Sequence, residues 1–157
     1  MADAAGGIYV MAWVPEYDAM RTFAAERIET FGLMDETFQP RPLPLEPFAD
    51  SMGVNTGTPE KIVTEFEPDA AIHVRTRLWH KSQQLDELPD GRLRVTLEVC
   101  NDYALRAWVL GFGPDAIVAH PETLARDIFE AADRTRRRYL RTLHSELRLE
   151  MLHMRAG

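Results

Sequence analysis

Apolar and β-branched residues gather in short stretches at the start of the chain, separated by polar turns. Residues 8–14 read Ile-Tyr-Val-Met-Ala-Trp-Val, a composition typical of a β-strand. Residues 15–18, Pro-Glu-Tyr-Asp, predict a turn into a second extended run over 19–28. A third short strand over 29–38 is anchored by Phe31, Leu33 and Phe38. We therefore predict a hairpin with a third strand, too few strands to close a barrel.

The next segment combines proline with polar and glycine residues. Pro40, Pro42, Pro44 and Pro47 fit neither a helix nor a hydrogen-bonded strand. Residues 50–59, which follow them, are polar and contain glycine. Together they predict a linker over residues 40–59, which divides the chain into residues 1–39 and residues 60–157.

Six segments beyond the linker alternate between strand and helix periodicity. The clearest strand is residues 92–100, where Leu93, Val95, Leu97 and Val99 alternate with polar residues. The six segments are, in order, a strand over 61–67, a helix over 68–81, strands over 82–88 and 92–100, a helix over 101–110 and a strand over 116–119. This β-α-β-β-α-β order is that of a split βαβ, or ferredoxin-like, domain.

A long helix is predicted from Pro121 to the end of the chain. Its apolar residues recur mostly every four positions and form one stripe: Leu124, Ile128, Ala132, Tyr139, Leu143 and Leu147. Such a stripe requires a cover, either the sheet or a second copy of the chain. The predicted fold class is therefore α+β, a partial barrel followed by a ferredoxin-like domain with a long C-terminal helix.

Composition narrows the class of protein. With 157 residues and 45% hydrophobic residues, the chain is large enough to build a core. Its net charge of −7 argues against a general nucleic-acid binder, although it permits a local basic pocket. A lone Cys100, five scattered histidines, no cationic-apolar leader and no long apolar run predict a soluble cytoplasmic protein without a structural metal.

Several short motifs resemble a known family of bacterial regulators. Residues 6–10, Gly-Gly-Ile-Tyr-Val, followed by Arg-Thr-Phe at 21–23 and Glu-Arg-Ile at 26–28, resemble the strand pair that names the WYL domain. The downstream half resembles the C-terminal extension that follows WYL domains. The matching segments there are residues 79–83, residues 90–91, residues 108–113 and Tyr139.

The resemblance implies an Sm-like or SH3-like small β-barrel and a ferredoxin-like domain, usually downstream of a winged helix-turn-helix. It also implies a transcriptional regulator whose barrel senses a nucleotide or single-stranded nucleic acid. Ile8 stands where the naming Trp is expected, and the helix-turn-helix and first barrel strands have no counterpart in this sequence. We therefore expect no direct promoter binding by this chain, and a second copy or partner chain that completes the barrel at the 8–14 edge.

Tyr9, Arg21 and Arg27 are the candidate ligand-binding residues, because they match the family positions that line a basic pocket. Arg21 and Arg27 differ by an even count, so an extended run would place both on one face. Two guanidinium groups hold phosphates, and a tyrosine ring offers a stacking surface. The alternative is that both arginines pair with acidic residues of the hairpin and Tyr9 packs as an ordinary strand residue. Those acidic residues are Glu16, Asp18 and Glu26.

Other chemistry-bearing residues favour structural roles. His80 beside Ser82 is the combination of a base and a nucleophile, yet residues two apart do not normally face each other and no third acidic group has a fixed role. Trp79, Trp108 and Phe112 are typical of a core. Residues 111–113, Gly-Phe-Gly, read as a helix stop. Five arginines between 134 and 141 are interleaved with acidic residues, which favours a solvated, self-paired helix face.

The sequence thus predicts a regulatory, ligand-sensing and dimerising module of a WYL-type transcriptional regulator. The alternative is a dimerisation or scaffold subunit without a ligand, either truncated from a DNA-binding protein or partnering one. No nucleophile or acid-base set points to an enzyme, and no cofactor is expected.

Overall fold

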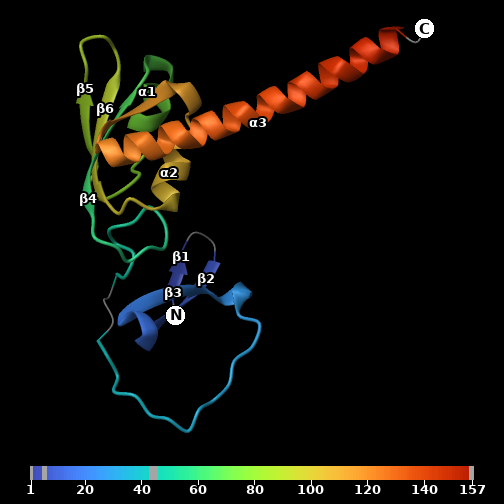
Figure 1. Cartoon of the computed structure of the whole chain (residues 1–157). Coiled ribbons are helices and arrows are strands. Elements are labelled where there is room, and N and C mark those ends of the chain that lie inside the picture. Colours follow the sequence, from blue (N-terminus) through green and yellow to red (C-terminus); the bar gives the residue numbers. More distant parts are fainter. Residues whose placement is uncertain (1, 5–6, 43–45, 156–157) are drawn as a thin grey trace.

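A computed structural model describes the backbone of residues 2–4, 7–42 and 46–155, and the side chains of residues 7–42 and 46–143 (Figure 1). The expected linker residue Pro44 lies outside the described residues. The described residues form two antiparallel sheets and three α-helices, which confirms the predicted α+β class. The ribbon shows a small N-terminal sheet and a larger C-terminal domain from which a long helix projects.

The N-terminal sheet has three strands in the order β1-β2-β3. They are β1 (Ala2–Ala4), β2 (Gly7–Val14) and β3 (Ala19–Ala24), all antiparallel to their neighbours. The predicted hairpin is confirmed as β2 and β3. The expectation that residues 8–14 form an edge strand is wrong, because β1 pairs with the first residues of β2 and places β2 in the middle of the sheet.

Two short 3₁₀ helices follow the hairpin strands. They are η1 (Pro15–Tyr17), which makes the predicted turn, and η2 (Ala25–Arg27), which ends β3. Asp18 closes the turn in the left-handed region at φ 47°, a conformation that aspartate tolerates better than most residues. The predicted extended run over 19–28 is therefore shorter than expected and stops at residue 24.

The third strand predicted over 29–38 is absent, since residues 28–42 form neither strand nor helix. No neighbouring strand pairs with their backbone, and a strand pattern without a partner does not make a sheet. Phe31 is 97% exposed and Phe38 is 85% exposed. No residue between 7 and 42 is buried, so this part of the chain builds no core of its own.

The C-terminal domain contains four strands and three α-helices in the predicted order. They are β4 (Glu60–Phe66), α1 (Pro68–Arg75), β5 (Gln84–Glu87), β6 (Leu93–Val99), α2 (Tyr103–Leu110), β7 (Ala116–His120) and α3 (Glu122–Arg155), with η3 (Gly113–Asp115) before β7. The sheet order is β5-β6-β4-β7 and every adjacent pair is antiparallel. This is the arrangement of a ferredoxin-like domain, as the element order predicted.

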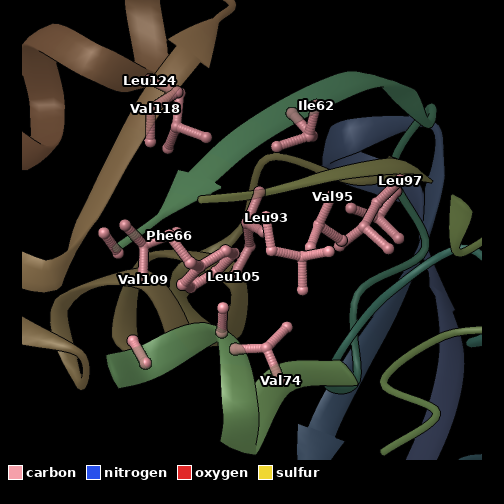
Figure 2. Close-up of a cluster of buried hydrophobic side chains, with 14 residues drawn as sticks. Ile62, Phe66, Val74, Leu93, Val95, Leu97, Leu105, Val109, Val118 and Leu124 are labelled. Atoms are coloured by element: carbon pink, nitrogen blue, oxygen red, sulfur yellow. The ribbon is translucent and has the colours of Figure 1, made fainter. Parts of the chain in front are cut away.

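One face of this sheet is covered by helices and forms the core. Alternate residues of β4 and β6 are buried on that face, and Figure 2 shows Phe66 among Leu93, Leu105 and Val109. On the opposite face Glu65 binds the guanidinium groups of both Arg92 and Arg94. That face therefore carries charged cross-strand pairs rather than apolar residues.

Helix α1 ends at Arg75, six residues before the predicted end. Side chains stabilise the turn that replaces the last part of the helix. The indole N–H of Trp79 donates to the carbonyl of Val74, and the Gln83 side chain accepts from the Trp79 N–H and donates to the Arg77 carbonyl. By contrast, α2 (Tyr103–Leu110) agrees closely with the helix predicted over 101–110, and the Asp102 carboxylate caps it by accepting from the Leu105 N–H at 2.9 Å.

Helix α3 contacts β7 and α2 through its first turns and then leaves the domain (Figure 1). Leu124 is fully buried, whereas Tyr139 is 67% and Leu143 is 51% exposed. The sheet therefore covers only the beginning of the predicted apolar stripe, and Leu147 lies beyond the residues whose side chains are described. None of the described helices is both long and apolar enough to cross a membrane.

Residues 46–59 lie against the C-terminal domain rather than forming a free linker. The carbonyl of Asp50 accepts a 2.7 Å hydrogen bond from the Cys100 N–H, and the thiol of Cys100 donates to the Gly57 carbonyl at 3.0 Å. Met52 packs on the edge of the core. The composition predicted a linker over 40–59, but hydrogen bonds to the end of β6 hold residues 46–59 on the domain.

Candidate functional site

The structure places Tyr9 and Arg21 on opposite faces of the N-terminal sheet. Tyr9 of β2 pairs with Ala24, and Arg21 of β3 pairs with Ala12. Directly paired residues share a face and successive residues alternate. Because Tyr9 and Ala12 are three positions apart, the two candidate residues face opposite ways.

Arg27 is not in the strand at all, because η2 interrupts the extended run before it. The even spacing between Arg21 and Arg27 therefore does not put them on a common face. Strand alternation applies only as far as Ala24, and the geometric premise for grouping the two arginines was wrong. Whether any of the three residues binds a ligand stays a prediction.

Arg21 packs on an aromatic ring instead of pairing with a carboxylate. Its guanidinium carbon lies 4.7 Å from the centroid of the Tyr17 ring, a cation–π arrangement. Within the described part of the chain, neither Arg21 nor Arg27 forms an ion pair. The alternative expectation that hairpin carboxylates neutralise them is therefore not realised, and both cations keep their hydrogen-bonding capacity.

A cavity of about 1200 Å³ opens on the face of the sheet that carries Tyr9. Its floor includes Met11 and Trp13 of β2 and Met20 of β3, which the register places on that same face. Residues 32–34 and 36–41 line the other side. The space is apolar and wide, as a site for a planar or chain-like ligand requires.

Arg41 supplies a positive charge to this cavity. Its guanidinium carbon lies 3.6 Å from the centroid of the Trp13 ring. An arginine stacked on an aromatic ring extends a flat surface and keeps its in-plane N–H donors for an anion. Trp13 and Arg41 therefore combine a stacking surface with a phosphate-type donor on one face of the sheet.

Sequence reasoning missed Trp13 and Arg41 as site residues. The signal for Trp13 was available, because it stands four positions after Tyr9 and strand alternation places both on one face. Arg41 lies between two prolines in the expected linker, and no local pattern connects it to Trp13. Only the path of residues 28–42 brings the two together.

His80 and Ser82 contact each other, contrary to expectation. The Ser82 hydroxyl lies 2.7 Å from His80 Nδ1, which also accepts from the Ser82 N–H at 3.2 Å. His80 Nε2 donates to the carbonyl of Ala49 at 2.7 Å. The Ser82 oxygen in turn accepts from the Glu98 N–H at 2.8 Å. Both ring nitrogens are committed to neighbouring groups, as in a structural histidine.

The remaining candidates behave as the sequence predicted. Trp79, Trp108 and Phe112 pack together, with ring centroids 5.5 to 6.2 Å apart, beside the buried ring of Phe66. Residues 111–113 end α2 and lead into η3.

The basic run of α3 is partly self-paired. Asp133 binds both Arg136 and Arg137, and Arg134 lies 3.9 Å from Glu130. The hydrogen bond from Arg136 is the main reason why the pKa of Asp133 lies below its usual value. Glu146 and Glu150, two further acidic residues expected to pair with these arginines, lie outside the residues whose side chains are described.

Metal and thiol chemistry find little support in the described region. Among the residues that the structure describes, no group of three His, Cys, Asp or Glu side chains is arranged to hold a metal ion. Cys100 is a buried free thiol, and burial raises its pKa. A buried thiol with a raised pKa is a poor nucleophile.

Comparison with known proteins identifies the class of the C-terminal domain. The WCX domain matches residues 58–136, which is half of the chain and includes every strand of the ferredoxin-like sheet. The chain belongs to the WCX-domain family. The predicted resemblance to the C-terminal extension of WYL regulators is thereby confirmed.

Individual relatives extend the comparison. Protein PafC of Mycobacterium leprae (strain TN) is 28% identical over 135 residues, a region that covers 79% of this chain and 38% of PafC. The chain thus spans well under half the length of this relative. The solved structure of proteasome accessory factor B/C (PafBC) of Arthrobacter aurescens is 22% identical, with a TM-score of 0.41 over 78% of this chain and 19% of that chain.

Proposed function

We propose that this chain is the regulatory part of a bacterial WYL-type transcriptional regulator and acts in the cytoplasm. In this proposal the N-terminal sheet binds a nucleotide or single-stranded nucleic acid, and the WCX domain contributes to assembly. The chain does not contact promoter DNA by itself and catalyses no reaction. Membership of the WCX family and similarity to PafC support the regulatory role.

The observation that carries the ligand proposal is the cavity on the Tyr9 face. A nucleotide needs a flat surface for its base and a donor for its phosphate, and Trp13 with Arg41 offers both. Arg21, on the opposite face of the sheet, and Arg27, in η2, remain candidate phosphate ligands outside this cavity. Single strands suit such a surface better than a duplex, because their unstacked bases are free to stack on aromatic and guanidinium groups.

Fluorescence polarisation tests the proposal. Short single-stranded DNA, single-stranded RNA and mononucleotides are titrated at two salt concentrations, with duplex DNA as a comparison. We expect salt-sensitive binding that Arg41→Ala weakens by about tenfold, with smaller losses for Arg21→Ala and Arg27→Ala. Arg126→Ala on α3, which removes a charge that is paired with Glu122, is the matched control and leaves binding unchanged. A folded protein that binds none of these ligands refutes the proposal.

The second candidate is a dimerisation or scaffold subunit without a ligand. It is favoured by the exposed apolar residues on the part of α3 that leaves the domain, because a solitary amphipathic helix gains stability from a partner. Tyr139 and Leu143 are one helical turn apart on that stripe. Sedimentation equilibrium of the whole chain tests it. A dimer that Leu143→Glu converts to a monomer supports the candidate, and a monomeric wild-type chain rules it out.

A further inference from the structure

The segment 46–59, called the strap below, joins the N-terminal sheet to the WCX domain through specific groups. Its first anchor is the Ala49 carbonyl on His80 Nε2 at 2.7 Å. Its second anchor is the Asp50 carbonyl on the Cys100 N–H at 2.7 Å. Both partners belong to the WCX domain, so the strap is held at fixed points along its length.

Ser51 provides a third anchor, and it is a buried residue at 8% exposure. Its oxygen accepts from the Gly53 N–H at 2.8 Å, while its hydroxyl donates to Asp102 Oδ2. The other oxygen of Asp102 accepts from the Leu105 N–H at 2.9 Å. One carboxylate therefore serves both the strap and the first turn of α2.

The strap also contacts the candidate ligand face, through the residue just before these anchors. Phe48 stands one residue before the first anchor, and its ring packs edge-on against Tyr9, with centroids 6.4 Å apart and planes at 72°. Tyr9 lies on the same face as the cavity. Phe48, which contacts this face, therefore stands only three positions before Ser51, which binds the residue that caps α2.

We propose that the strap transmits the state of the N-terminal sheet to the start of α2, from the Tyr9–Phe48 ring contact to the Ser51–Asp102 hydrogen bond. A planar anionic ligand that stacks on Tyr9 competes with Phe48 for the ring. Displacement of Phe48 shifts Ser51 and weakens the Asp102 cap. This inference rests on the proposed ligand site for its biological use, but the coupling itself exists without a ligand.

The proposed coupling depends on the short path between the Tyr9–Phe48 contact and the Asp102 cap of α2. The two end links are direct contacts between described residues, and the Ser51–Asp102 hydrogen bond is partly buried and made to a carboxylate, which makes it stronger than a neutral one. Losing one such link leaves Ser51 or Asp102 with an unpaired group in a poorly solvated place. The start of α2 therefore responds to changes at Phe48, whereas the central strands of the four-stranded sheet, β4 and β6, do not.

Amide hydrogen exchange of the whole chain without ligand tests the coupling. The readouts are the Leu105 and Gly53 amides, with the Val95 amide in β6 as an internal reference. We expect Phe48→Ala and Tyr9→Leu each to raise exchange at Leu105 by roughly threefold to tenfold while Val95 stays unchanged. Phe31→Ala, which removes an exposed ring from the same part of the chain, is the matched control and has no effect at Leu105.

A double-variant comparison separates transmission from general loosening. In a Ser51→Ala background, Tyr9→Leu is expected to add no further change at Leu105, because the link that carries the effect is already broken. The inference is overturned if Tyr9→Leu changes only amides within residues 7–24, or if its effect at Leu105 persists in Ser51→Ala. Absence of nucleotide binding with intact coupling would remove the proposed ligand alone and leave the strap.

Discussion

Thr64 offers a direct test of how the core of the WCX domain is assembled. This residue lies in β4 on the face covered by helices, is only 1% exposed, and its hydroxyl has no hydrogen-bond partner among the described residues. Val has nearly the same shape without the polar atom. We expect Thr64→Val to stabilise the chain, because a buried hydroxyl without a partner costs about 1 to 3 kcal/mol.

The magnitude follows from two contributions with the same sign. Removing the unpaired hydroxyl recovers its desolvation cost, and the added methyl group increases apolar burial. Allowing for slight crowding in a packed core, a net gain of about 1 kcal/mol is expected. For a domain of this size that gain raises the Tm by roughly 4 to 8 °C.

Thermal and urea unfolding followed by circular dichroism measure the effect. Thr96→Val, on the opposite and partly exposed face of β6, is the matched control and should change stability by less than about 0.5 kcal/mol. Thr64→Ser, which keeps the hydroxyl and loses the methyl, should be destabilising. A Thr64→Val chain less stable than the wild type would refute the reasoning, since the hydroxyl would then be contributing a bond.

Three further predictions concern the strap, the thiol and the last helix. A Cβ at Gly53 would lie 2.8 Å from the Ala104 Cβ, so Gly53→Ala should cost about 1 to 3 kcal/mol in unfolding free energy, and Ala104→Gly in the same chain should recover part of that loss. Because burial raises the pKa of Cys100, its thiol should react slowly with a disulfide reagent until the chain unfolds. Rapid labelling of the folded chain would contradict this reasoning. The buried neutral thiol should contribute its full stabilisation below about pH 8 and lose it as the pH rises further. The Arg136 hydrogen bond lowers the pKa of Asp133, so a carbon NMR titration should show this carboxylate losing its proton at a lower pH than usual, and Arg136→Ala should raise that pKa. The stabilisation that the ionised carboxylate provides should be present above about pH 4 and lost on acidification.

Sequence alone predicted the C-terminal domain well because its signals are local. The alternation in residues 92–100 and the glycines that end the helix at 111–113 each specify an element through neighbouring residues. The order of these elements then restricts the sheet to few topologies. The end of α1 was missed because Trp79 and Gln83 stop the helix through side-chain hydrogen bonds that no periodicity records.

The candidate site was harder to predict because it depends on register and on long-range contacts. Assigning Arg21 and Arg27 to one face required an unbroken strand, and η2 interrupts it. Arg41 reaches Trp13 only through the path of a segment without regular structure. The sequence identified Tyr9 as a candidate residue, but Arg41, which lines the cavity on the same face, lies in the predicted linker.

The length of α3 gives its orientation a large mechanical effect. The last residue of α3 that packs against the described core is Ile128, and at 1.5 Å per residue the remaining turns reach roughly 40 Å further, to Arg155. A tilt of about 10° at the packed end therefore moves the far end by about 7 Å. Since α2 is one of the elements that hold the packed end, a change of angle at the start of α2 produces a larger displacement at the far end of α3 than at its base.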